Sequence, residues 1–183
     1  MKLDVLPPTQ PQTRPWYAGG LSFTCTQCGN CCTGPPGYVW ISDDEIARLA
    51  EFLKLSVREV RLRYCRKVGS RWSLKERKTP EGNYDCIFLR DEPLPPAQKR
   101  DLAPSEPLPQ RRRSCSIYAV RPLQCRTWPF WDSNLSDKKM WDLASRKCPG
   151  MSRGPRTFTR EQIEKLRDAR QWPDDAPSST RRR

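Results

Sequence analysis

Four cysteines within eight consecutive positions are the part of this sequence with the clearest chemistry. Two Cys-x-x-Cys steps overlap and a fourth cysteine follows directly, at Cys25, Cys28, Cys31 and Cys32. A Cys-x-x-Cys step lets one tight turn aim two sulfurs at a single ion, and Gly29 can adopt the positive φ that such a turn favours. Three sulfurs on one short loop can also hold three corners of an iron–sulfur cubane. The cluster therefore predicts a metal site.

Cys31 and Cys32 are neighbours in the sequence. Because adjacent side chains of an extended segment point to opposite sides, we expect these two thiols to serve different metals. The alternative for such a cluster is a set of reduced cysteines used as small core side chains. Core packing gives no reason to place four cysteines so close together, so metal binding is the favoured interpretation.

The rest of the composition favours metal over disulfides. The chain has nine cysteines, an odd number, and its start lacks an apolar run of the length that a secretory signal needs. No stretch approaches the roughly 20 apolar residues of a membrane span, so we expect a cytoplasmic protein without membrane contacts, whose thiols stay reduced. The chain has no histidine, which excludes His-based triads and mixed Cys/His zinc sites.

The chain is strongly basic, with a formal net charge of +13. Eight thiolates (−8) and two divalent ions (+4) would lower this charge to +9. Basic charge favours the deprotonated thiol that binds metal. It also favours acidic proteins and weak, salt-dependent nucleic-acid contacts as partners. No recognised nucleic-acid-reading motif accompanies the triple-arginine runs at 111–113 and 181–183, so nucleic-acid binding is kept as an alternative function.

The segments that position the cysteines predict a small α+β domain with few short strands, two to four helices and disordered termini. Only 36% of the residues are hydrophobic, and a small core is commonly stapled by metal. Short strands are predicted at 72–74 and 86–89, on either side of a turn at 80–83. Helices are predicted where a capping box opens an amphipathic pattern. The three boxes are Ser42 with Glu45, Ser56 with Glu59, and Thr159 with Gln162.

Proline and charge divide the chain into three parts. Residues 1–20 are predicted to be a flexible N-terminal arm, and residues 21–155 a cysteine-cluster metal-binding domain. Residues 156–183 are predicted to hold the last helix and a disordered basic tail. Within the domain, residues 91–113 contain six prolines and end in three arginines, and they predict a mobile surface insert.

The order of the cysteine motifs resembles the YkgJ-type CxxCxxCC cysteine-cluster family, whose domain is described as zinc- or iron-chelating. After the opening cluster, the resemblance continues over about residues 20–155. The later motifs are Cys86-Ile87-Phe88-Leu89, Cys115-Ser116-Ile117-Tyr118-Ala119-Val120-Arg121-Pro122 with Cys125-Arg126 and Pro129-Phe130, and Cys148-Pro149-Gly150. The resemblance implies chelation by eight cysteines, which are Cys25, Cys28, Cys31, Cys32, Cys86, Cys115, Cys125 and Cys148.

The ninth cysteine, Cys65, falls outside the motifs and is predicted to be a buried structural thiol. The other eight suffice for two four-sulfur sites, and one larger cluster is the alternative. Arg121 and Arg126 flank Cys125 and are predicted to hydrogen-bond and neutralise the thiolates. The nearby aromatic residues are predicted to cover the site and pack the core, and they are Trp128, Phe130, Trp131 and Trp141.

Zinc is the favoured metal, because eight thiolates divide into two tetrahedral sets in a domain that needs stapling. Iron or an iron–sulfur cluster is the alternative, favoured by the triple-thiol loop. Some proteins with this motif resemble flagellin lysine methylases, in which an iron–sulfur centre accompanies S-adenosylmethionine. This sequence has no Gly-x-Gly nucleotide loop and no Cys-x-x-x-Cys-x-x-Cys spacing. The sequence therefore leaves enzymatic activity undecided.

Overall fold

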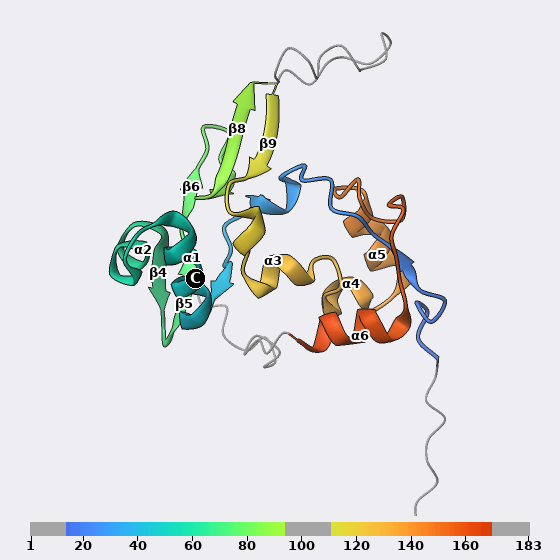
Figure 1. Ribbon diagram of the computed structural model, residues 1–183. Helices are drawn as coiled ribbons and strands as arrows, with labels where there is room; N and C mark the ends of the chain where they lie inside the picture. Colours follow the sequence, from blue (N-terminus) through green and yellow to red (C-terminus); the bar gives the residue numbers. More distant parts are fainter. Residues whose placement is uncertain (1–13, 94–110, 170–183) are drawn as a thin grey trace, which may run out of the picture.

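The computed structural model describes residues 14–93 and 111–169, and these form a small α+β fold (Figure 1). The helical elements are α1 (Asp43–Leu53), α2 (Val57–Tyr64), α3 (Leu123–Thr127), α4 (Asp132–Leu135), α5 (Lys138–Ser145) and α6 (Arg160–Asp168), with two 3-10 turns, η1 (Asn30–Cys32) and η2 (Tyr118–Val120). The strands are β1 (Leu21–Ser22), β2 (Thr33–Gly34), β3 (Trp40–Ile41), β4 (Cys65–Val68), β5 (Arg71–Leu74), β6 (Glu76–Lys78), β7 (Tyr84–Cys86), β8 (Leu89–Pro93), β9 (Arg111–Cys115) and β10 (Thr157–Phe158).

The strands pair in short antiparallel sheets. Two sheets have three strands, in the orders β2-β7-β6 and β3-β5-β4, and two ladders have two strands, β1-β10 and β8-β9. Each sheet is too small to be stable by itself and depends on packing against helices and loops. Two separate hydrophobic clusters supply that packing.

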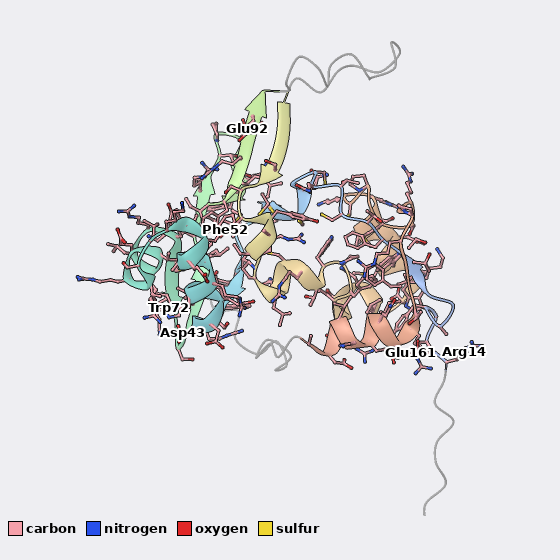
Figure 2. The ribbon with its side chains drawn as sticks, viewed as in Figure 1. Arg14, Asp43, Phe52, Trp72, Glu92 and Glu161 are labelled. Atoms are coloured by element: carbon pink, nitrogen blue, oxygen red, sulfur yellow. The ribbon has the colours of Figure 1, made fainter. Side chains whose placement is uncertain are left out.

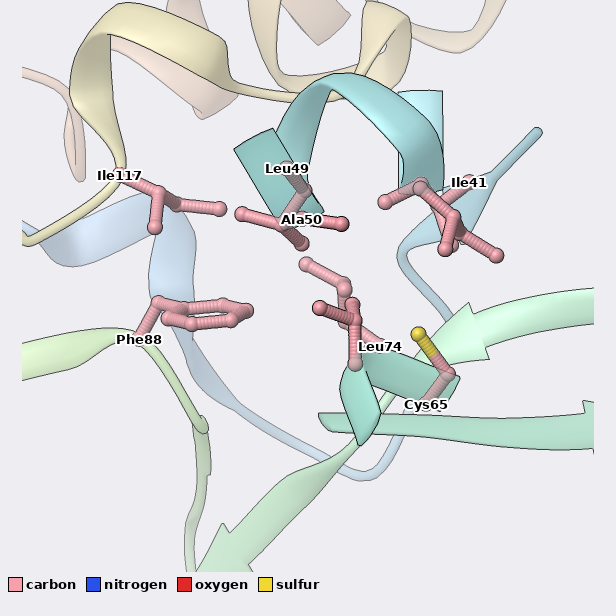
Figure 3. Close-up of a cluster of buried hydrophobic side chains, with 9 residues drawn as sticks. Ile41, Leu49, Ala50, Cys65, Leu74, Phe88 and Ile117 are labelled. Carbon is pink, nitrogen blue, oxygen red and sulfur yellow. The ribbon is translucent and has the colours of Figure 1, made fainter. Parts of the chain in front are cut away.

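The first core cluster lies where α1 and α2 cover the β3-β5-β4 sheet. Its buried members are Ile41, Ile46, Leu49, Ala50, Val60, Cys65, Leu74, Phe88 and Ile117. Figure 3 shows the side chain of Leu49 from α1 facing those of Leu74 and Phe88 across this cluster. Both predicted capping boxes form, since Ser42 accepts a hydrogen bond from the Glu45 amide and Ser56 accepts one from the Glu59 amide. The helices predicted there are confirmed.

The second core cluster lies among α4, α5 and α6, on the opposite side of the fold (Figure 1). Its buried members are Tyr17, Phe23, Phe130, Leu135, Trp141, Met151, Phe158 and Ile163. The ring of Phe130 lies 4.7 Å from that of Phe158 and 5.9 Å from that of Trp141, so aromatic packing dominates. The predicted capping box of Thr159 and Gln162 also forms and opens α6, which confirms that helix.

The end of the predicted N-terminal arm packs into the second core cluster. Residues 1–13 lie outside the described residues, but Tyr17 is only 5% exposed, and the Trp16 indole donates a 2.8 Å hydrogen bond to the Leu135 carbonyl. The prediction of a flexible arm up to residue 20 is therefore wrong for residues 16 and 17. Two large aromatic side chains gain enough from burial to hold this segment against α4.

The predicted strand at 86–89 is divided by a turn. Cys86 ends β7 and Leu89 begins β8, while Phe88 turns into the first core cluster and is 1% exposed. The turn at 80–83 accordingly joins β6 to β7, and the 72–74 strand pairs with β3 and β4. Burial of the Phe88 ring therefore overrides the continuous strand that the apolar pattern predicts.

The edges of the predicted insert belong to the β8-β9 ladder, whose register runs from Leu89↔Cys115 to Pro93↔Arg111. Residues 94–110 lie outside the described residues, so the mobility of that part stays a prediction. Glu92 lies on the outer half of this ladder (Figure 2). The ladder thus fixes Cys115 beside the first core cluster.

In the part of the chain that the structure describes, no helix combines the length and apolar character needed to cross a membrane.

Candidate metal centre

The cysteine loop is shaped by two residues with positive φ. Gln27 has φ 56° and Gly29 has φ 74°, and the amide of Cys32 donates a 2.9 Å hydrogen bond to the Gly29 carbonyl. A Cβ at Gly29 would lie 2.8 Å from Leu89 Cδ1 and 3.0 Å from Arg113 Cβ. The positive φ that the sequence suggests for Gly29 is confirmed, and the loop packs directly on the β8-β9 ladder.

The other four cysteines of the motif come from four different segments. Cys86 ends β7, Cys115 ends β9, Cys125 lies in α3, and Cys148 follows α5. Cys86 and Cys115 pack against the first core cluster, whereas Cys25 and Cys148 pack against the second. The thiols therefore lie between the two hydrophobic clusters.

All eight cysteines of the motif line one cavity of about 150 Å³. Cys65 does not line it. All nine cysteines are free thiols in this structure. The structure thus gathers in one place the residues that the motif singles out, although they come from five separate segments.

The thiols line the cavity without already forming a coordination shell. Among residues 14–93 and 111–169, no three cysteine or acidic side chains have the spacing needed to hold an ion as they stand. The sulfurs of Cys31 and Cys32 lie 3.8 Å apart. Ligation therefore requires the remaining side chains to turn inward from the cavity wall.

Comparison with known proteins matches the same part of the chain. A family model matches residues 24–149, and its description is "CxxCxxCC: Putative zinc- or iron-chelating domain". The chain belongs to this CxxCxxCC family. An uncharacterized protein from Methanocaldococcus jannaschii is 30% identical over 114 residues, which cover 62% of this chain and 48% of that protein. The chain thus spans about half the length of this curated relative. No solved structure matches it.

Burial controls the protonation of most thiols in this CxxCxxCC domain. Burial raises the pKa of Cys86 to about 11, and it also raises the pKa values of Cys115 and Cys148. The pKa of Cys125 is well above its ordinary value, first because of burial and then because the charges of neighbouring thiolates oppose its ionisation. Without a cation these thiols hold their protons at neutral pH. A bound ion would displace those protons, so metal affinity should fall as the pH falls.

Cys31 and Cys32 behave as a pair that shares a proton. The hydrogen bond that Cys32 donates lowers the pKa of Cys31 to about 7, and the same bond, followed by burial, raises the pKa of Cys32 well above its ordinary value. The charge of Arg121 adds to the lowering at Cys31. Cys31 is also exposed, so this thiol is accessible from solvent.

Arg121 lies against the cavity. Its guanidinium stacks 3.6 Å from the centre of the Tyr118 ring, its Nε donates to the Tyr118 carbonyl, and its Nη1 is 4.0 Å from the Cys25 sulfur. These contacts hold one positive charge beside several thiols. Such a group favours the deprotonated state that a metal needs.

Arg126 takes a different position from the one the sequence suggests. Its Nε donates to the Arg121 carbonyl at 3.0 Å, and its Nη2 lies 3.4 Å from Glu45 Oε1. It lines a separate cleft of about 560 Å³, on whose wall Asp43 and Trp72 also lie (Figure 2). Arg126 therefore stabilises the position of α3 instead of touching the thiols.

Sequence reasoning treated Glu45 only as a helix cap and missed its second contact. Glu45 Oε2 accepts from the Ser42 amide at 3.0 Å, and Oε1 accepts from the Leu123 amide at 2.6 Å. Leu123 begins α3, which carries Cys125. One buried carboxylate thus ties the start of α1 to the helix that supplies a thiol. The only signal in the sequence was the capping box of Ser42 and Glu45.

The aromatic residues divide between the cavity and the core. Phe130 and Trp141 are buried in the second core cluster, whereas Trp128 lines the thiol cavity and Trp131 lines a neighbouring one. The indole N–H of Trp128 is buried and has no nitrogen or oxygen acceptor. The interaction of this N–H with the Cys148 sulfur lowers the pKa of Cys148 and so partly opposes the larger rise caused by burial. A buried donor beside a thiol suits a thiolate acceptor, so the site fits a bound cation that keeps Cys148 deprotonated.

Cys65 is expected to be dispensable for metal binding. Its sulfur points among apolar side chains of the first core cluster (Figure 3), and burial raises its pKa to about 11. Cys65→Ala should leave the metal content unchanged, while Cys65→Ser should lower stability by about 1–3 kcal/mol because it buries a hydroxyl. Elemental analysis and urea unfolding check both results, with Cys125→Ser as the matched variant that loses metal. A Cys65→Ala protein depleted of metal would contradict this assignment.

Proposed function

We propose that this CxxCxxCC domain binds soft metal ions through eight cysteines, with zinc favoured over iron and with the bound metal as part of the folded structure. The observation that carries the proposal is the single cavity lined by all eight thiols of the motif. The family description, which names zinc or iron, supports chelation as the activity.

The donor set suits zinc. The eight candidate ligands are all sulfur, and zinc forms tetrahedral four-thiolate sites. A bound ion would supply positive charge that neutralises crowded thiolates and would cross-link the segments that carry them. The chain's own contribution is the positive charge of Arg121, the buried indole N–H of Trp128, and two hydrophobic clusters that hold the thiols between them.

Metal content under anaerobic purification tests the proposal. We expect a colourless protein with about two zinc ions per chain and few reactive thiols in the native state, because eight thiols bind metal and Cys65 is buried. Elemental analysis, the absorption spectrum and a thiol assay measure these quantities. A brown protein with iron and acid-labile sulfide would overturn the zinc assignment. It would favour the iron–sulfur alternative, in which the protein is an iron–sulfur-dependent enzyme. A protein purified without any metal, and unable to take up zinc or iron, would refute chelation itself.

A further inference from the structure

We propose that the eight cysteines form two separate four-sulfur sites for soft divalent cations. The first site consists of Cys31, Cys32, Cys86 and Cys125, and the second of Cys25, Cys28, Cys115 and Cys148. This division rests on the proposed chelating function. It assigns the partners that the sequence leaves open, and it separates two cysteines of the opening loop from the other two.

A second cavity distinguishes the two sets. It has a volume of about 210 Å³, and Glu76, Tyr84 and Trp131 are among the residues that line it. The four cysteines of the first site line this cavity as well as the thiol cavity, whereas those of the second site line the thiol cavity alone. The first set therefore lies together on the wall that the two cavities share.

The spacing of Cys31 and Cys32 fits ligation of one ion. Their sulfurs are 3.8 Å apart, and the edge of a tetrahedron with zinc–sulfur bonds of about 2.3 Å is also about 3.8 Å. The expectation that these neighbours serve different metals assumed an extended segment. Both residues instead belong to the 3-10 turn η1, in which neighbouring side chains do not point to opposite sides.

Strand pairing brings Cys86 to the same place. In the β2-β7 ladder, Gly34 pairs with Tyr84 and Thr33 pairs with Asp85. Cys32 directly precedes Thr33 and Cys86 directly follows Asp85, so both cysteines lie at the same end of this ladder. Cys125 in α3 completes the set, and its helix is held by the Glu45–Leu123 hydrogen bond.

The second set is brought together by backbone contacts at the other end of the loop. Phe23 forms an antiparallel bridge with Met151, and the Thr24 amide donates to the Gly150 carbonyl at 3.0 Å. The Asn30 side chain donates to the Lys147 carbonyl at 2.9 Å. These contacts place Cys25 and Cys28 beside the segment that carries Cys148.

Cys115 joins this set from the other side of the loop. Gly29 follows Cys28 and packs on Arg113, which lies two residues before Cys115 in β9. An ion in the second site would therefore connect both core clusters, because Cys115 packs on the first and Cys148 on the second.

Double Cys→Ser substitutions distinguish this assignment of cysteines to two sites from other assignments. The full-length protein is loaded with cadmium-113, a spectroscopic substitute for zinc, and cadmium content and cadmium NMR signals are recorded. We expect two signals in the wild type. Cys31→Ser/Cys32→Ser should lose one signal and one of the two ions per chain, and Cys25→Ser/Cys28→Ser should lose the other. The matched cross-pair Cys28→Ser/Cys32→Ser should lose both.

Two results would overturn the division. If Cys25, Cys28 and Cys31 shared one ion and Cys32 served another, Cys31→Ser/Cys32→Ser would lose both signals. In the wild type, a cadmium–proton correlation assigns each ion to the β-protons of its cysteines, so the test does not depend on a variant that folds. A cadmium signal correlated with cysteines of both sets would also refute the division while leaving chelation intact, whereas a wild type that binds no cadmium would refute chelation too.

Discussion

Removal of the bound metal by an external chelator is expected to abolish the cooperative unfolding transition of the domain. The thiols come from five segments and lie between two hydrophobic clusters, and α3 and α4 contain only five and four residues. Structural zinc contributes an apparent ~10–16 kcal/mol in small domains, as large as the whole net stability of a typical domain. Without the ion, the segments between the clusters rely on short ladders and single hydrogen bonds, each of which contributes much less to stability.

Thermal unfolding with and without a strong chelator measures this effect. The unfolding is monitored by the near-ultraviolet circular dichroism of the tryptophans. We expect the sharp transition and the aromatic signal to be lost together and to return when excess zinc is added. Cys28→Ser and Cys125→Ser should reproduce part of the loss, because each removes one candidate ligand. A metal-free protein that melts within a few degrees of the loaded one would show that the two hydrophobic clusters are sufficient by themselves.

Replacement of Glu45 is expected to destabilise the protein far more than the same replacement at Glu59. Both residues complete a capping box with a serine three positions earlier. Glu45, however, is 8% exposed and also accepts from the Leu123 amide, so Glu45→Ala leaves the partly buried Leu123 amide without this acceptor. Each lost acceptor of this kind costs about 1–3 kcal/mol, so we expect a loss of roughly 3 kcal/mol for Glu45→Ala. The side chain of Glu59 is 40% exposed, and Glu59→Ala removes a helix cap and a surface ion pair with Arg63, which contributes little.

Glu45→Ala and Glu59→Ala should differ in metal affinity as well as in stability. Because the Glu45–Leu123 bond positions the helix of Cys125, Glu45→Ala should weaken metal binding by about 10–100-fold, as loss of a positioning contact commonly does. Competition with a chromophoric chelator measures this change, and Glu59→Ala should bind like the wild type. Equal effects of the two substitutions would show that Glu45 acts as an ordinary helix cap.

Local patterns predicted the starts of three helices correctly. In a capping box both partners lie within three residues, so the sequence contains the whole interaction, and Ser42, Ser56 and Thr159 all act as predicted. The helices α3 and α4 were not predicted. Neither helix is capped by the side chain of its own N-cap residue, and the first amide of α3 is bound by Glu45, which is remote in the sequence. Interactions of that kind leave no mark on a local pattern.

The candidate ligands were also predictable, because ligand chemistry depends on residue type and short spacing. The Cys-x-x-Cys steps and the later motifs identified the eight thiols, and Cys65 was correctly set apart as buried. The role of Arg126 was not predictable from its place beside Cys125. A side chain next to a ligand in a helix points to another face, and here that face meets Glu45.

The sequence by itself determined which side chains could bind metal and where the capped helices begin, since both depend on residues that are close along the chain. Only the tertiary structure decided which thiols are neighbours. Cys32 and Cys86 lie at the same end of the β2-β7 ladder, and Cys25 and Cys148 pack against the same core cluster. The physical reason is that the burial of two hydrophobic clusters folds distant segments together, and the single cavity between these clusters follows from that burial and not from the spacing of the cysteines.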